Sequence, residues 1–185
     1  MTSSSTNSFS DGSQASGPTV YGGHTASGEK SRVLLTATCF IVRDGKVLLQ
    51  ERGPGRRWAG VLNGPGGKIE PGETPVQAIK REVAEETSLV IHEPTSHGLV
   101  RLVLTGPQPH ELLIHIFSVT EFSGEPRGVE DLVHWYPRGR LPFERMWPDQ
   151  RYWLPLVLDG GRLEVSCLFD EARFALEQCE LHLKL

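Results

Sequence analysis

The hydrophobic pattern from residue 33 onward predicts a mixed α/β domain in which strands outnumber helices. Apolar and β-branched residues fill 33–42 and 46–50, and the Asp44-Gly45 pair between them is typical of a hairpin turn. Further apolar or alternating runs predict strands at 99–105, 112–120, 131–136, 163–169 and 176–183. The last two runs are expected to pair with each other.

One stretch, 74–87, has strong helical character. Thr74 and Gln77 match a capping box, and Pro75 occupies the first helical position, where its missing N–H is not needed. The residues expected to form its buried stripe are Val76, Ile79, Val83 and Val90. A second, weaker helix is predicted at 149–158, although a proline interrupts it.

The first 31 residues differ in composition from the rest of the 185-residue chain. They contain nine serines and five glycines and hardly any bulky aliphatic side chains. Such a segment buries too little apolar area to offset its ordering entropy, so we expect 1–31 to be a disordered tail and 32–185 to be one domain. The tail lacks the apolar core of a secretory signal, and no run in the chain is long enough to span a membrane.

The charge and the cysteines restrict the function classes further. The formal net charge is −4, without the basic surplus on which non-specific nucleic-acid binding depends. The three cysteines, Cys39, Cys167 and Cys179, form no C-x-x-C pair. We therefore expect neither a disulfide framework nor a thiolate zinc site, but buried thiols in a reducing, cytoplasmic compartment.

Three carboxylates gather on the strong helix. At 100° per residue, Glu82, Glu85 and Glu86 fall within an arc of about 100° beside the apolar stripe, so they are expected to lean toward the protein body. No basic residue follows any of them by four positions, and like charges at this spacing repel unless a cation compensates. Hard divalent cations prefer such oxygens, so Mg²⁺ fits this cluster.

The alternative interpretation is a solvated polar helix face. The loop before the helix argues against it, because Gly64, Gly66 and Gly67 let backbone carbonyls approach a metal or phosphates closely. The combined segment resembles the Nudix box, G-x5-E-x7-R-E-U-x-E-E-x-G-U with U aliphatic. The matching residues are Gly67, Glu73, Arg81, Glu82, Val83, Glu85, Glu86 and Leu89. Ser88 departs from the pattern, where a left-handed helix end would cost serine about 1 kcal/mol relative to glycine.

The resemblance implies an α/β/α sandwich around a central mixed sheet, with the box as a loop-helix-loop, and hydrolysis of a nucleoside diphosphate linked to another group. It implies that Glu82, Glu85 and Glu86 hold Mg²⁺, which Mn²⁺ can replace, with help from a carbonyl in the Gly66-Gly67 turn. Arg81 and Glu73 would pair and orient the helix and loop. Glu130 would be a second metal ligand or a general base, or else a solvated loop acid.

A second stretch, MWPDQRYWLPLVL within 141–158, is similar to MWPDDxYWxPLLL of the eukaryotic-type oxidised purine nucleoside triphosphatases in the MutT branch. The segment NGPGGK, from Asn63 to Lys68, is similar to their NGFGGK. The resemblance implies that Trp147 stacks on the purine, that Asn63 and Asp149 bind its edge, and that Lys68 also contacts the substrate. Gln150 stands where that group has a second aspartate.

The expected activity is therefore Mg²⁺-dependent cleavage of an oxidised purine (deoxy)nucleoside triphosphate, of the 8-oxo-dGTP type, to the monophosphate and pyrophosphate. Gln150 leaves the preference between guanine-type and adenine-type bases open. Alternatives are a Nudix hydrolase of normal nucleoside triphosphates, dinucleoside polyphosphates or ADP-ribose, and a nucleotide sensor without activity. The three glutamates favour an enzyme. Trp58 and Trp153 are expected to pack rather than bind, and the oligomeric state stays open.

Overall fold

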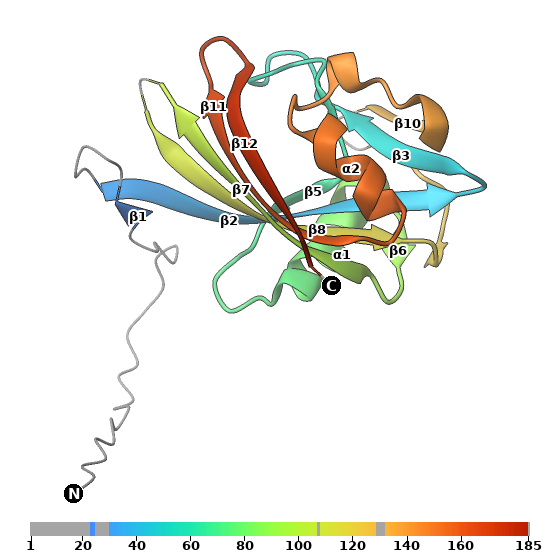
Figure 1. Cartoon of the computed structure of the whole chain (residues 1–185). Coiled ribbons are helices and arrows are strands. Elements are labelled where there is room, and N and C mark those ends of the chain that lie inside the picture. Colours follow the sequence, from blue (N-terminus) through green and yellow to red (C-terminus); the bar gives the residue numbers. More distant parts are fainter. Residues whose placement is uncertain (1–22, 25–29, 107, 129–131, 185) are drawn as a thin grey trace, which may run out of the picture.

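The computed structural model describes residues 23–24, 30–106, 108–128 and 132–184, which form a mixed sheet with two α-helices (Figure 1). The elements are β1 (Gly23–His24), β2 (Lys30–Arg43), β3 (Lys46–Glu51), β4 (Leu62–Asn63), β5 (Gly66–Lys68), α1 (Pro75–Thr87), β6 (Val90–Ile91), β7 (Thr95–Thr105), β8 (His110–Val119), β9 (Phe122–Ser123), β10 (Leu132–Pro137), the 3₁₀ turns η1 (Arg138–Arg140) and η2 (Phe143–Arg145), α2 (Gln150–Leu158), β11 (Arg162–Asp170) and β12 (Ala175–Lys184). None of the helices in these ranges is long and apolar enough to cross a membrane.

The main sheet has the strand order β10-β3-β2-β8-β7-β11-β12. β2 runs parallel to β8 and β11 runs parallel to β7, while the other pairs in this order are antiparallel. The short strands β4 and β5 pair with β3 and β2. The expected mixed sheet is confirmed, as is the antiparallel pairing of the last two strands.

β2 is buried on both faces, because its successive side chains point alternately to the two sides of the sheet. Each side is covered by one of the two helices. Ala37, Cys39 and Ile41 pack in one core cluster with Ile79 and Val83 of α1. Phe40, between them, packs in the other cluster, which contains Trp153 and Leu154 of α2. The resulting helix-sheet-helix arrangement is the predicted α/β/α sandwich.

Both ends of α1 follow from its sequence. Thr74 Oγ1 accepts from the Gln77 backbone N–H at 3.2 Å, and Gln77 Oε1 accepts from the Thr74 N–H at 2.8 Å, so the predicted capping box is present. Ser88 takes the left-handed conformation (φ 61°) and its N–H donates to the Ala84 carbonyl. The helix thus ends in the geometry favoured by glycine even though serine stands there.

The predicted buried stripe of α1 is half wrong. Ile79 and Val83 are fully buried, but Val76 and Val90 are 40% and 55% exposed. Val76 lies in the first turn, before the helix meets the sheet, and Val90 lies in β6, beyond the left-handed residue that breaks the helical period. The remaining buried positions of the helix are Ala78 and Thr87.

The cysteines correct a second expectation. Cys167 and Cys179 lie directly opposite each other on the antiparallel strands β11 and β12, and they form a disulfide. Adjacent strands hold their side chains within reach of such a bond, and this register is not evident from cysteine spacing alone. Cys39 is a free thiol, whose pKa is raised by complete burial.

Other boundaries differ less. β7 begins at Thr95 rather than at residue 99, with a register shift between Ser96 and Gly98 and a left-handed Gly98 (φ 112°). The proline of α2 lies on its exposed side and does not end the helix. β1 and the first residues of β2 come from the predicted tail, and 1–22 and 25–29 lie outside the described residues.

Candidate functional site

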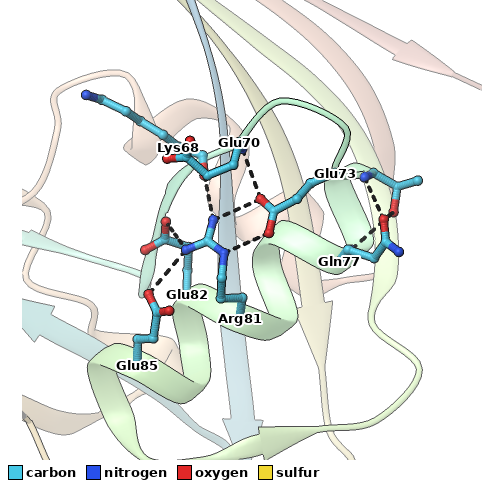
Figure 2. A network of polar contacts seen from close by, with 8 residues as sticks. Lys68, Glu70, Glu73, Gln77, Arg81, Glu82 and Glu85 are labelled. Atoms are coloured by element: carbon cyan, nitrogen blue, oxygen red, sulfur yellow. Dashed lines mark hydrogen bonds and ion pairs between the residues drawn. The ribbon is translucent and has the colours of Figure 1, made fainter. Parts of the chain in front are cut away.

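Arg81 joins α1 to the loop that precedes it (Figure 2). Its Nε and Nη2 donate to the two carboxylate oxygens of Glu73 at 2.7 and 2.9 Å, and Nη2 also donates to the Lys68 carbonyl at 3.0 Å. These hydrogen bonds from Arg81 are the main reason that the pKa of Glu73 is lowered to about 2. The predicted pairing of Arg81 with Glu73 is therefore present, and it holds the loop against the helix.

The same guanidinium compensates the acidic cluster. Arg81 Nη1 lies 2.9 Å from Glu82 Oε1 and 3.2 Å from Glu85 Oε2 (Figure 2). Arg81 precedes Glu85 by four positions, so the compensating cation lies at helical spacing on the N-terminal side of Glu85, and not on its C-terminal side. As they lie, the described carboxylates, histidines and cysteines form no group of three that could hold a metal ion.

Glu82 and Glu86 face the glycine loop. The Gly66 N–H donates to Glu86 Oε2 at 2.9 Å, and the Glu82 carboxylate lies directly against Gly67. Glu85 is different, because its side chain is 61% exposed, so the expectation that all three carboxylates lean on the protein body is wrong for it. The glycines of this loop have no side chains that would fill the space beside the two carboxylates. Carboxylates are hard oxygen donors, and this donor set fits a divalent cation.

Gly67 offers a direct test of this arrangement. A Cβ at this position would lie closer than 3.0 Å to the Glu82 carboxylate, which real Cβ atoms essentially never do. Because the colliding atoms are the end of a flexible side chain, we expect Gly67→Ala to keep its melting temperature but to lower metal-dependent turnover about tenfold or more, by displacing Glu82. Gly139→Ala is the control, since a Cβ there meets open space. Unchanged turnover in Gly67→Ala would contradict the placement of Glu82.

A cavity of about 550 Å³ joins the acidic helix face to the far side of the sheet. The expected site residues that line it are Asn63, Gly67, Lys68, Glu82, Glu86, Trp147, Asp149 and Gln150. Glu73, Arg81 and Glu85 lie outside its lining. Glu130 lies outside the described residues. The structure therefore brings two of the three predicted carboxylates, Glu82 and Glu86, into one space with the polar residues predicted to bind the base.

Two polar pairs form the end of the cavity near α2. Asn63 Oδ1 accepts from Gln150 Nε2 at 2.7 Å. Asp149 Oδ2 accepts from Trp153 Nε1 at 2.7 Å, and Asp149 is 2% exposed. Burial is the main cause that raises the pKa of Asp149 to about 6, against the lowering effect of the Trp153 hydrogen bond.

Aromatic rings hold Trp147 in place. Its ring centroid lies 4.9 Å from that of Trp58, 5.1 Å from Phe169 and 5.3 Å from Phe174. Trp58 packs as expected, but it also lines the cavity. Trp153 packs edge-on against Phe40, and its N–H additionally positions Asp149, a role that packing alone did not predict.

The arginines of the glycine-rich loop before Asn63 were not among the predicted site residues. Arg52, Arg56 and Arg57 line the cavity, and Arg57 Nη2 lies 2.6 Å from the almost fully buried Glu171 Oε2 at the end of β11. Their clustering within 52–57 was the available signal. Arginines that line the cavity can attract a polyanionic ligand, while the carboxylates lie at the other end of the same cavity.

Comparison with known proteins agrees with this geometry. The family model described as NUDIX domain matches residues 33–157. The chain belongs to the Nudix hydrolase family. Nudix hydrolases act on small nucleotide substrates and generally use divalent metal ions.

Individual relatives of this Nudix hydrolase are similar over most of the domain. It is 36% identical over 132 residues to the oxidized purine nucleoside triphosphate hydrolase of Danio rerio, covering 69% of this chain and 81% of the relative. It is 36% identical over 100 residues to the 8-oxo-dGTP diphosphatase of Haemophilus influenzae, covering 52% and 71%. The crystal structure of the mutator MutT protein from Bacillus halodurans superimposes with a TM-score of 0.71 at 25% identity, covering 80% of this chain and 97% of the other.

Proposed function

We propose that this Nudix hydrolase cleaves oxidised purine (deoxy)nucleoside triphosphates, of the 8-oxo-dGTP type, and thereby removes them from the nucleotide pool. Water attacks a phosphorus atom, the bond between the α and β phosphates breaks, and the products are the monophosphate and pyrophosphate. The observation that carries the proposal is the shared cavity, in which Trp147, Asn63 and Asp149 lie in the same space as Glu82 and Glu86.

The cofactor in this proposal is Mg²⁺, which Mn²⁺ can replace. Glu82, Glu85 and Glu86, together with the carbonyl of Gly67, would hold the ion. When bound, it neutralises phosphate charge and makes water nucleophilic near neutral pH. Arg81 holds the helix and loop in register through Glu73, and so keeps these donors in place.

The other end of the cavity binds the base in this proposal. Trp147 stacks on the purine, and its rigid aromatic surroundings reduce the entropy lost when a base is bound. Asn63, Asp149 and Gln150 supply polar atoms to the base edge. Lys68 lines the cavity and is exposed, so its ammonium group can bind a phosphate of the substrate.

Turnover across a substrate panel tests the proposal. With Mg²⁺ present, pyrophosphate and monophosphate release are measured for 8-oxo-dGTP, dGTP, dATP, ADP-ribose and a dinucleoside polyphosphate. We expect 8-oxo-dGTP to have the highest kcat/KM. A preference for ADP-ribose would overturn the assignment, and tight binding of every nucleotide without turnover would indicate a sensor instead.

We also propose a cytoplasmic location, where free nucleotides are available, and action on small molecules without a stable nucleic-acid or membrane partner. The net charge of −4 supports the absence of nucleic-acid binding. Alkylation of thiols in freshly lysed cells tests the location, because a reducing cytoplasm would reduce the disulfide that the structure shows between Cys167 and Cys179. A fully oxidised pair would indicate another compartment.

A further inference from the structure

The orientation of two amides in the cavity follows from one backbone contact. Asn63 Oδ1 accepts from the Gly64 backbone N–H at 2.9 Å. A backbone N–H only donates, so the oxygen of Asn63, and not its nitrogen, must face it. The same oxygen accepts from Gln150 Nε2, which therefore turns the Gln150 oxygen away from Asn63.

Two buried acceptors are left in this part of the cavity. Gln150 Oε1 and Asp149 Oδ1 have no hydrogen-bond partner among the described residues, and their residues are only 4% and 2% exposed. Asp149 accepts from Trp153 through its other oxygen, and this bond holds the plane of its carboxylate in place. Buried acceptors without a donor destabilise a protein, and a ligand that donates to them relieves this cost.

We propose that Gln150 determines base specificity, forming with Asp149 a pair of acceptors that selects guanine-type purines over adenine-type purines. The inference rests on the proposed function, since it concerns the base end of the same cavity. A guanine edge presents two neighbouring donors, N1–H and the 2-amino group, beside the O6 acceptor. The oxygen of the Asn63 amide already accepts two hydrogen bonds. The nitrogen of the same amide is a donor suited to O6.

An adenine edge does not match this set. It presents one donor, the 6-amino group, beside the lone pair of N1, so one of the two pocket oxygens would face another acceptor. A carboxyl group at position 150 could bind a proton and present an O–H to N1. The Gln150 amide cannot, because it carries no titratable proton and its nitrogen is held by Asn63. Its oxygen is therefore a permanent acceptor.

A series of product analogues tests this without any variant. Quenching of tryptophan fluorescence, in the absence of metal, gives the affinity for 8-oxo-dGMP, for 8-oxo-dIMP, which lacks the 2-amino group, and for 8-oxo-dAMP. We expect 8-oxo-dIMP to bind roughly tenfold more weakly than 8-oxo-dGMP, and 8-oxo-dAMP at least as weakly. Equal affinities for all three would overturn the proposal.

Gln150→Leu then assigns the effect to this residue. We expect it to weaken 8-oxo-dGMP about tenfold or more while changing 8-oxo-dAMP less than about threefold. Gln178→Leu, an exposed position on β12, is the matched control and should change neither. Gln150→Met, checked like the first variant by thermal melting, provides a second replacement if leucine disturbs the fold. An unchanged guanine-to-adenine ratio in a folded variant would refute the role of Gln150.

These measurements separate the two proposals. Discrimination among the monophosphates that is lost in Gln150→Leu, without turnover of any triphosphate, would uphold base recognition by Gln150 and overturn the proposed hydrolysis. Turnover of 8-oxo-dGTP with no discrimination among the monophosphates would uphold the hydrolysis and overturn the role of Gln150.

Discussion

Glu86→Gln is expected to lower kcat/KM for 8-oxo-dGTP by about 10³-fold while leaving the fold intact. The substitution is selective, because a glutamine oxygen can still accept from the Gly66 N–H that now meets Glu86 Oε2 at 2.9 Å. What is removed is the negative charge, in a cavity where the neighbouring Glu82 carboxylate lies against Gly67. The loss therefore reports on cation binding rather than on loop position.

Steady-state turnover and Mn²⁺ titration by calorimetry measure this effect. We expect the Mn²⁺ affinity of Glu86→Gln to fall in parallel with its activity. Glu177→Gln, exposed on β12 and outside the cavity, removes the same charge elsewhere and should behave as the unmodified protein. Wild-type activity in a folded Glu86→Gln protein would refute the metal-binding role of this helix face.

Much of the acidic region could be predicted because its chemistry is local in sequence. The capping box and the Arg81–Glu73 pair depend on side chains within eight positions of each other. The left-handed helix end at Ser88 was not predicted, because serine stands where the pattern has glycine. The environment of Glu85 could not be predicted from the helical arc alone. An arc places a residue on a face, whereas exposure depends on how far the sheet extends under that face.

Contacts between distant segments of the chain could not be predicted from the sequence. Cys167 and Cys179 meet because β11 and β12 pair in one particular register, and a slip of one residue would place them on opposite faces. Likewise, Arg57 meets Glu171 only because the glycine-rich loop and the end of β11 close on the same cavity. Neither pairing has a signature in composition or spacing.

The base end of the cavity shows a third kind of limit. Similarity to a known motif indicated which residues belong there, namely Asn63, Trp147 and Asp149. It did not indicate their hydrogen-bond directions. These depend on a backbone N–H at Gly64 and on the indole N–H of Trp153, which lies one helical turn after Asp149.

Asp149→Asn is expected to raise stability and abolish most activity at the same time. Burial raises the pKa of Asp149 to about 6 from 3.8, which corresponds to about 3 kcal/mol against the ionised form at neutral pH. Asparagine removes this cost but leaves an amide N–H without a partner, so we expect a net gain of about 1–2 kcal/mol, or roughly 4 °C in melting temperature. Asp44→Asn, at the exposed hairpin turn, is the control.

Activity should change in the opposite direction. The amide can keep its oxygen on Trp153 Nε1, and it then presents NH₂ where Asp149 Oδ1 presents a free acceptor. A donor facing the donors of a guanine edge should lower kcat/KM for 8-oxo-dGTP by about 10²–10³-fold. If Asp149→Asn remained fully active, Asp149 would not be an acceptor for the base.

The pH dependence of the unmodified protein follows from the same carboxyl group. Its effect on stability and its effect on activity should run in opposite directions as the pH changes. Between about pH 4 and 6 the folded protein holds a proton on Asp149 that the unfolded chain has released, so this group stabilises the fold at low pH, and the contribution is lost as the pH rises through about 6. The ionised carboxylate is the form that accepts from the base, so kcat/KM for guanine-type substrates should fall as the pH drops below about 6. The effect of this carboxyl is isolated by measuring melting temperature and turnover against pH for both the unmodified protein and Asp149→Asn. In the variant, the part of each pH dependence that comes from Asp149 should be absent. Parallel slopes in the two proteins would show that Asp149 does not titrate in this range.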